Sequence, residues 1–375
     1  MKVSIILDIK GMKRLESQWN GFISAHSESP FLLSGFVEQF LESDARDFMQ
    51  RYLVFQVDKN VVGIVPVEIG DIGFKYCRFV PGKDFQPELL FNPKYQTICL
   101  RVTLDILFRR IKCKFIDFFL PATHQSLPAL YKVSKESGIH LEVSPDTGRA
   151  TVRVTCSWAQ FEKERRHLRR EFERTERRLR ELGQLEINWL GKEDDKTEVL
   201  SKILKVEETS WKKPYLARSG FKVDPTIQFI LDGCTRTSLM QSEFDWGVAL
   251  LRLDKKPIAY SLFLEHKGHA YICKTSFNKQ YRQQGPGIYV NYSVVRQLMN
   301  RTNIRIIDFM TDIAFSHKWA SEIVPVDHIV LSQGIAPILL RQVLSTHVSK
   351  TAMYTLGTLS PFSNYTHKLI TAVNA

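Results

Sequence analysis

The 375-residue sequence shows little of three patterns that would assign it to well-defined classes of protein: long apolar runs, paired cysteines and the pattern expected of a secretory signal. No stretch approaches the roughly 18 to 20 uninterrupted apolar residues that span a bilayer, so we expect no transmembrane segment. At the N-terminus, Asp8 and Lys10 end a short apolar run and no small-residue cleavage site follows, which favours a first β-strand over a secretory signal. The six cysteines form no CxxC pair. We therefore expect a cytoplasmic protein that binds no metal.

The composition is that of a folded chain with unevenly distributed charge. Hydrophobic residues make up 44% and aromatic residues 11%, which is enough to build cores, and the length favours two domains. The net charge is +12, of which +2 falls in residues 1–150 and +10 in residues 151–375. A basic second half favours an anionic ligand, a nucleic acid or a membrane surface, and charge alone does not distinguish these.

The first half reads as a mixed α/β unit. Two runs of β-branched and aromatic residues within 52–69 predict a hairpin, and FIDFFLP (115–121) predicts a buried strand. SPDTGRA (144–150) is rich in turn residues and is a plausible domain boundary. We therefore expect one domain over residues 1–150 and a second over residues 151–375.

The second domain is expected to begin with a basic helix, WAQFEKERRHLRREFERTERRLRELG (158–183). Residues 161–180 hold nine Lys and Arg against five Glu. Its apolar positions form one narrow stripe that ends at a capping Gly183: Leu168, Phe172, Leu179 and Leu182, with Thr175 between. The pattern is compatible with a solvated helix carrying Glu–Arg pairs, or with a helix that binds nucleic acid or an acidic partner. A membrane-surface helix is less favoured because the apolar face is thin.

The remaining pattern repeats the order of the first half: helices, antiparallel strands, a helix, then a strand carrying Asp-Phe. FIDFFL (115–120) and IIDFMT (306–311) make the parallel visible. The sequence therefore predicts a duplication and an α/β (mixed α+β) fold. Further elements are predicted as strands at 185–190, 244–254, 256–277, 304–310, 326–332 and 353–358, and as helices at 195–209, 223–238, 288–300 and 335–345.

The loop RQQGPG (282–287) joins an apolar strand-like run to an amphipathic helix. A helix N-terminus exposes unpaired N–H groups and a partial positive charge, and glycines let a ligand approach the backbone closely. The loop is not a Rossmann fingerprint, because Val290 stands where the third glycine is needed, and no Gly-Lys-Ser/Thr follows to make a P-loop. By itself the pattern is compatible with a plain turn or with a site for a pyrophosphate.

In its context this loop resembles the acyl-CoA-binding loop of the GNAT N-acyltransferases. Segments 168–183, 258–281 and 308–319, together with Trp211-Lys212, look like the CelD-like or BioF2-like branch of that superfamily, which is related to the FemAB aminoacyl transferases. RYLVFQV and RFVPGKDF in the first half are similar to the same group. The resemblance implies two tandem GNAT-like domains, each a mostly antiparallel mixed sheet flanked by helices. The second domain would keep the cofactor loop, and the first would be degenerate.

The resemblance also implies roles for single residues. Strand 270–276 would part from strand 304–309 so that the thioester and pantetheine arm lie between them. The loop would bind the pyrophosphate of acetyl-CoA or another acyl-CoA through Arg282, Gln283, Gln284, Gly285, Pro286, Gly287 and Ile288. A free backbone amide near Lys274, Thr275 and Ser276 would polarise the thioester carbonyl. The acyl group would pass directly to an acceptor amine, without a covalent enzyme intermediate.

The sequence departs from the family after the Asp-Phe strand. Relatives usually show Gly and then Tyr-Lys-x-x-Trp, whereas here the stretch is DFMTDIAFSHKWA (308–320). The glycine is missing, Phe315 and Ser316 replace the Tyr and Lys, Lys318 lies two residues later, and Trp319 matches. If the Tyr or Lys served as acid or phosphate contact, this protein performs that step differently or accepts another donor.

Several polar residues are candidates for proton transfer, each with a plain structural alternative. Asp308 would lie beside the cleft, or cap a local turn; Glu265 would reach the amine, or be solvated at a hairpin edge. His317 is a candidate acid or base, or an exposed loop residue, and Tyr289 would protonate the departing thiolate, or pack its ring. Residues expected on the acceptor side are Trp211, Lys212, Lys318 and Trp319.

We therefore predict an acyl-CoA-dependent N-acyltransferase acting on a small-molecule or polymer-precursor amine. One alternative is a FemAB-type transfer from aminoacyl-tRNA, for which the basic helix would be a docking surface. The short 184–195 connection does not match the long helical hairpin of those enzymes, so this reading comes second. A non-catalytic tandem-GNAT binding module is the third reading, because the 308–319 segment is altered.

Overall fold

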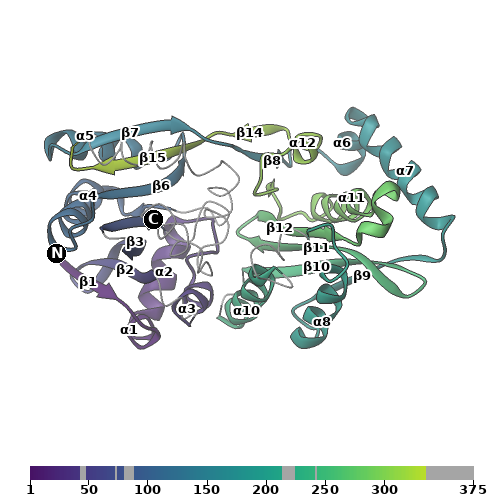
Figure 1. Ribbon diagram of the computed structural model, residues 1–375, viewed down its shortest axis with the longest axis horizontal. Coiled ribbons are helices and arrows are strands. Elements are labelled where there is room, and N and C mark those ends of the chain that lie inside the picture. Colours follow the sequence, from purple (N-terminus) through teal and green to yellow (C-terminus); the bar gives the residue numbers. More distant parts are fainter. Residues whose placement is uncertain (43–47, 72–73, 80–87, 213–223, 241–242, 335–375) are drawn as a thin grey trace, which may run out of the picture. The chain divides into compact units, whose positions relative to one another are not determined.

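The computed structural model describes residues 1–42, 48–71, 74–79, 88–212, 224–240 and 243–334. The chain divides into two compact units, each with its own β-sheet and hydrophobic core (Figure 1). Of the described residues, the first unit comprises those within Met1–Ser27 and Phe31–Gly148 and those from Val324 to Gly334, and the second comprises those within Glu28–Pro30 and Arg149–Ile323.

The first unit is built on a sheet in which most neighbours are antiparallel. Its strands follow the order β1 (Lys2–Ile6), β2 (Phe48–Val57), β3 (Asn60–Asp71), β4 (Lys75–Phe79), β6 (Phe115–Pro121), β15 (Val326–Ser332) and β7 (His140–Pro145), and β5 (Leu90–Phe91) pairs with β3. Asp58 and Lys59 take positive φ angles of 49° and 67° between β2 and β3, so this hairpin has the turn that suits the twist of its strands.

Helices cover both faces of this sheet because the strand residues alternate between two apolar faces. Leu53 and Phe55 belong to the core shared with α4 (Gln96–Asp105) and α5 (Leu127–Glu136), and the 106–110 turn extends α4. Tyr52 and Val54 face the other core, which contains residues of α1 (Ile9–Lys13), α2 (Glu16–His26) and α3 (Ser34–Glu42).

The second unit repeats this plan. Its strands follow the order β14 (Glu322–Val324), β8 (Arg149–Arg153), β13 (Ile306–Asp308), β12 (His269–Phe277), β11 (Lys256–His266), β10 (Phe244–Leu253) and β9 (Leu185–Gly191). Helices α7 (Arg166–Arg180) and α11 (Pro286–Met299) pack together on one face, and α8 (Lys196–Glu207) and α10 (Pro225–Met240) lie on the other (Figure 1). The short elements are α6 (Trp158–Glu164), the 3₁₀ helix η4 (Lys279–Gln284) and α12 (Ala314–His317).

The two sheets share one strand pattern, which confirms the predicted mixed α/β fold built from two similar domains. In each sheet four antiparallel strands are followed by one parallel neighbour, β6 beside β4 and β13 beside β12. The strand beyond this parallel neighbour is antiparallel to it and does not follow it or precede it directly in the chain. It is β15 beside β6 in the first sheet, and β8 beside β13 in the second. Because β15 returns to the first sheet, the first unit includes residues beyond the expected 1–150.

The basic segment 158–183 is not the single helix that the sequence predicts. It breaks at Arg165, which has φ −110° and ψ 52° and donates hydrogen bonds to the carbonyls of Ala320 (2.7 Å) and Lys318 (3.4 Å). Leu168, Thr175 and Leu179 are buried as the stripe predicts, whereas Leu182 is exposed beyond the helix end. The predicted helix at 335–345 and strand at 353–358 lie outside the described residues.

Candidate functional site

Two parallel strands of the second unit part from each other at a defined point. Strand β12 pairs with β13 over three steps that end at Tyr271 opposite Asp308. Beyond this step β12 runs on to Phe277 with no further pairing to β13 in the described chain. We call the side of β12 that faces away from β11, from Ile272 onward, the outer edge. Like any strand edge that is not paired with a neighbouring strand, it offers backbone groups to other partners.

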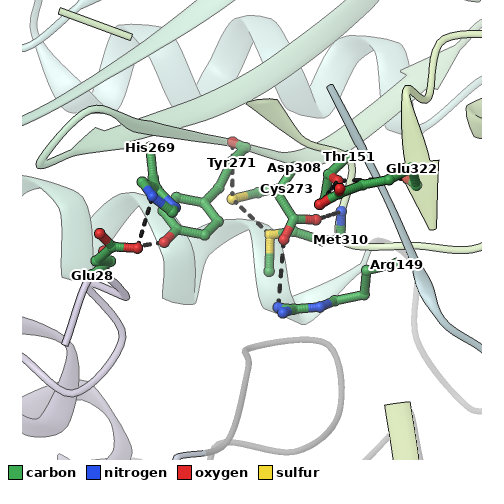
Figure 2. A network of polar contacts seen from close by, with 9 residues as sticks. All are labelled: Glu28, Arg149, Thr151, His269, Tyr271, Cys273, Asp308, Met310 and Glu322. Carbon is green, nitrogen blue, oxygen red and sulfur yellow. Dashed lines mark hydrogen bonds and ion pairs between the residues drawn. The ribbon is translucent and has the colours of Figure 1, made fainter. Parts of the chain in front are cut away.

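A β-bulge lies just after this point. Leu262 of β11 pairs with Lys274 and Phe263 pairs with Ile272, so Cys273 is an extra residue on β12. Its sulfur lies 3.6 Å from the sulfur of Met310, across the gap between the two strands (Figure 2). A bulge generally bends its strand, and this one lies where β12 leaves β13.

The loop after β12 ends in a helix start that the two glycines make possible. Gly285 has φ 75° and ψ 39°, a left-handed conformation that glycine adopts at little energetic cost. Gly287 lies so close to Phe277 that a Cβ would approach its ring to 3.1 Å. Ile288 and Tyr289 donate their amides to the Gly285 carbonyl, at 2.9 and 3.3 Å, whereas the Gly287 amide has no acceptor within the described chain. The glycines therefore have a packing role and also expose a donor.

The basic helix α7 lies against this loop. The guanidinium of Arg178 is 3.4 Å from the Gln283 carbonyl, and Thr175 packs beside Gly285. Arg282 is exposed, while the side-chain oxygen of Gln284 is buried without a partner in the described chain. The loop is thus bordered by positive charge, which favours an anionic ligand.

Side chains of β12 tie the strand to the helix start. Thr275 donates to Asn291 (3.1 Å), and Asn291 donates to the carbonyl of Gly287 (2.8 Å). The hydroxyl of Ser276 is buried without a partner in the described chain. Sequence reasoning missed Asn291, although its i+4 spacing from Gly287 on a predicted helix was a usable signal.

A buried polar cluster lies on the face covered by α8 and α10. Lys274 forms an ion pair of 3.1 Å with Asp224, whose pKa falls to about 2 because Lys274 and hydrogen bonds from Thr226 outweigh its burial. Lys212 donates to the Thr275 carbonyl at 3.1 Å. Close by, Glu207 accepts hydrogen bonds of 2.6 Å from Tyr260 and 3.3 Å from Ser210. Only Lys212 and Lys274 of this cluster were named from the sequence; Glu207, Asp224 and Tyr260 lie on separate elements, and no local motif connects them.

The four candidate acid–base residues are not brought together. Asp308 is only 4% exposed and lies at the point where the strands part. It accepts a hydrogen bond of 2.6 Å from the Met310 amide and pairs with Arg149 at 3.4 Å (Figure 2). Glu265 lies six residues along β11 from Ala259, which pairs with Phe277, and is therefore at the far end of β12 from the loop. Burial raises the pKa of Glu265 although Arg301 pairs with it.

Tyr289 and His317 also have local partners. The Tyr289 ring stacks on Phe172 of α7, with centroids 4.8 Å apart, and burial raises its pKa. His317 is exposed on α12 and pairs with Asp312. Neither contact involves the outer edge of β12.

The residues expected on the acceptor side fall into two groups. Lys318 pairs with Glu171 of α7 at 2.8 Å, and Trp319 is 1% exposed within the core. Ser316, which replaces the family's Lys, is buried and accepts from the Ile313 amide. Trp211 is exposed beside Phe277, so with Lys212 it lies next to the outer edge of β12.

The described residues contain neither a candidate metal cluster nor a candidate membrane-spanning helix. Within them no three His, Cys, Asp or Glu side chains converge in a manner that would hold a metal ion. No helix among the described elements has both the length and the apolar character needed to cross a bilayer.

Comparison with known proteins gives the family of this region. Residues 166–318 match the family described as acetyltransferase (GNAT) domain. No curated protein matches the chain. The matched region lies within the second unit and includes α7, the parted strands and the loop.

Solved structures show the fold of the whole chain. The C-terminal DUF2156 domain of a protein assigned as a lysylphosphatidylglycerol synthetase from Agrobacterium fabrum superposes with TM-score 0.56 at 14% identity, covering 89% of this chain and 96% of that one. FemX gives 0.51 at 12% identity over 87% and 97%, and L-PGS from Bacillus licheniformis gives 0.54 at 11% over 88% and 95%. The predicted resemblance is thereby confirmed as far as a GNAT-domain match in the second unit and a shared fold over most of the chain, while the FemAB-related and the narrower CelD-like or BioF2-like placements stay predictions.

Proposed function

We propose that the protein transfers an acyl group from a CoA thioester to an acceptor amine. The observation that carries this proposal is the parting of β12 from β13 directly before a glycine loop that opens a helix. Extended backbone at the outer edge suits the amide-containing pantetheine arm, and the helix start with Gly287 suits the pyrophosphate. Acetyl-CoA is the simplest donor to test, and the acceptor would be a small-molecule or polymer-precursor amine.

The reaction is a direct displacement. The amine nitrogen attacks the acyl carbon, the C–N bond forms, and the C–S bond then breaks to release the thiolate, which takes up a proton. The protein contributes by orienting the two reactants and by placing donors near the carbonyl oxygen. Asp308 and Glu265 remain candidates for taking the amine proton, but each already has a cationic partner.

A calorimetric titration of acetyl-CoA tests this assignment. Saturable binding is expected for the wild type and for a Gly21→Glu control, because a side chain at Gly21 meets nothing within 4 Å. Gly287→Glu is expected to abolish binding, because it places a carboxylate where the pyrophosphate would lie. Arg282→Glu is a second test, which reverses a charge on an exposed side chain and so avoids the contact with Phe277. Absence of binding to the wild type at millimolar ligand would refute the CoA proposal.

One observation favours a second function, the FemAB-type transfer from an aminoacyl-tRNA. Four exposed arginines at steps of four, four and three make no ion pair or side-chain hydrogen bond within the described chain: Arg166, Arg170, Arg174 and Arg177. The glutamates of α7, in contrast, are largely occupied, Glu171 by Lys318, Glu173 by Arg169 and Glu176 by Arg180. Guanidinium groups on one helix face suit phosphates.

RNA binding separates the two functions. Under the second reading, the affinity for a bulk tRNA mixture falls steeply with salt, because each phosphate contact adds to the slope. An Arg170→Gln/Arg174→Gln double variant would then show a shallower slope, whereas an Arg169→Gln variant, which removes a paired arginine, would change it less. A flat salt dependence in the wild type would leave the CoA reading alone.

A further inference from the structure

The outer edge of β12 is bounded at both ends. At one end it pairs with β13 as far as Tyr271. At the other end the Asn278 amide donates to Ile258 of β11, so the alternate residues Thr275 and Phe277 direct their backbone groups away from β11. The backbone groups of these two residues therefore point to the side opposite β11.

Part of this edge is already occupied by the segment 209–212. The Lys279 amide donates to the Thr209 carbonyl at 3.0 Å, and Ser210 forms a β-bridge with Asn278. The Lys212 ammonium donates to the Thr275 carbonyl at 3.1 Å. Between this contact and the end of the β13 pairing, only Ile272–Lys274 remain, and this short stretch contains the bulge. A thioester that binds at the outer edge therefore lies directly beside Lys212.

The Lys212 ammonium has spare hydrogen-bonding capacity. An ammonium has three donors, and within the described chain Lys212 Nζ makes one hydrogen bond. Its neighbours are otherwise engaged: Lys274 with Asp224, and Glu207 with Tyr260 and Ser210. Burial lowers the pKa of Lys212. The positive charge of Lys274 also lowers this pKa, whereas the negative charge of Glu207 raises it. A partly buried cation with two unused donors favours an oxygen that carries negative charge.

We propose that Lys212 is a catalytic residue that donates a hydrogen bond to the carbonyl oxygen of the donor's acyl group. This assignment rests on the proposed acyl-CoA function. When the amine attacks, the carbonyl π electrons move onto this oxygen, and the ammonium stabilises the oxyanion until the C–S bond breaks and the carbonyl re-forms. Lys212 remains protonated throughout; the proton lost by the amine nitrogen passes to the departing thiolate. The role differs from acceptor binding, which the sequence had suggested for this residue.

The test compares the affinities of acetyl-CoA and free CoA, because the two ligands differ at the acyl carbonyl. In the wild type, the contact with Lys212 is expected to make acetyl-CoA bind more tightly than CoA by a factor on the order of ten. Lys212→Met is expected to bring this ratio close to one while CoA itself still binds. Lys212→Arg, which keeps a charged donor, is expected to retain part of the preference. Lys205→Met, on the exposed side of α8, is the matched control and leaves the ratio unchanged.

Each outcome decides between the claims. A ratio that is the same in the wild type and in Lys212→Met overturns the assignment and leaves the CoA function intact. A parallel loss of affinity for both ligands in Lys212→Met, with the ratio preserved, shows a purely structural role for the 209–212 segment and also overturns it. Failure of both ligands to bind the wild type overturns the acyl-CoA function, and the assignment falls with it.

Discussion

The strand that carries Asp-Phe in each unit holds its aspartate in the same setting. Asp308 lies opposite Thr151 of β8 and pairs with Arg149, two residues earlier on that strand. Asp117 lies opposite Val330 of β15 and pairs with His328, again two residues earlier, at 2.6 Å. A diagonal pair of a carboxylate and a basic side chain occurs at the same register in both units, and it is best explained as part of the duplicated sheet. This shared setting favours a structural role for Asp308 over a role as base.

The units differ where their parallel strands part. In the first unit, the last parallel step, Arg78 opposite Asp117, is followed by Phe79 and Phe118, whose rings stack with centroids 4.2 Å apart. In the second unit, Ile272 and Phe309 follow the corresponding step. Two buried stacked rings fill the junction in the first unit, whereas the second has a smaller side chain, a bulge and the glycine loop. The same sheet plan thus supports a ligand site better in the second unit.

The largest effect is expected from removing the cation in the second unit. Arg149→Met leaves the buried Asp308 carboxylate without its ion pair, and the free energy of unfolding should fall by about 3 kcal/mol. His328→Gln in the first unit should cost less, because His328 and Asp117 are more exposed. Urea unfolding of both variants measures this difference. The control is Arg153→Met, on the same strand as Arg149; it breaks an exposed ion pair with Glu322 of β14 and should change stability much less.

A second effect of similar size is expected in acid. Burial lowers the pKa of His266, in the second unit, to about 4, from an ordinary value near 6.5. The unfolded chain therefore takes up a proton that the folded chain does not, and stability falls as the pH drops from about 6.5 to about 4, by about 3 kcal/mol in total. Neither ring nitrogen has a partner in the described chain.

The two units again provide the comparison. His266→Phe should flatten the acid dependence of urea unfolding over this pH range. In the first unit, burial also lowers the pKa of His124 to about 4, but this residue is only half buried, so His124→Phe should flatten the dependence less. His140→Phe, at an exposed position, is the control. An unchanged acid dependence in His266→Phe would show that other groups control acid unfolding.

The elements that carry strong periodicity were predictable from the sequence. The 52–69 hairpin, the 115–121 strand and the 326–332 strand were found close to their observed bounds. That the last of these strands completes the first sheet was not predictable, because strand pairing depends on contacts distant in the sequence. The break at Arg165 was missed for a similar reason: the carbonyls that receive its guanidinium lie more than 150 residues later.

The candidate site was predictable only in part. The loop 282–287 was located from its two glycines. Gly285 has a left-handed backbone conformation and Gly287 packs closely against Phe277, and both settings favour glycine. The acid–base candidates were chosen by position along single strands, and such positions do not reveal partners on other elements. Arg149 beside Asp308 and Arg301 beside Glu265 are such partners.

A smaller effect is expected from Asp308→Asn. The change keeps the side-chain shape and a carbonyl oxygen for the Met310 amide but leaves Arg149 without a counter-charge, so stability should fall by about 2 kcal/mol. If Asp308 is structural, the affinity for acetyl-CoA should stay within about two-fold of the wild type. Asp117→Asn gives the matched change in the first unit. Calorimetric titration and urea unfolding on the same samples separate the two effects, and a selective loss of ligand affinity in Asp308→Asn would return this residue to the ligand site.

The smallest effect concerns the glycine that the family usually has after the Asp-Phe strand. Met310 occupies that place with φ 54°, whereas no residue from Phe118 to Leu120 of the first unit has a positive φ. A left-handed conformation costs a non-glycine residue about 1 to 2 kcal/mol, so Met310→Gly removes this strain. Three effects of this substitution are destabilising. The contact with Cys273 is lost, the packing of the half-buried methionine side chain is lost, and the unfolded chain gains conformational entropy at a glycine. The net change should therefore be no more than about 1 kcal/mol in either direction, which thermal unfolding can measure. A large loss of stability would mean that the Met310–Cys273 contact holds the parted strands together. The stability of this junction in the second unit would then depend on a sulfur contact, whereas in the first unit it depends on the stacked rings.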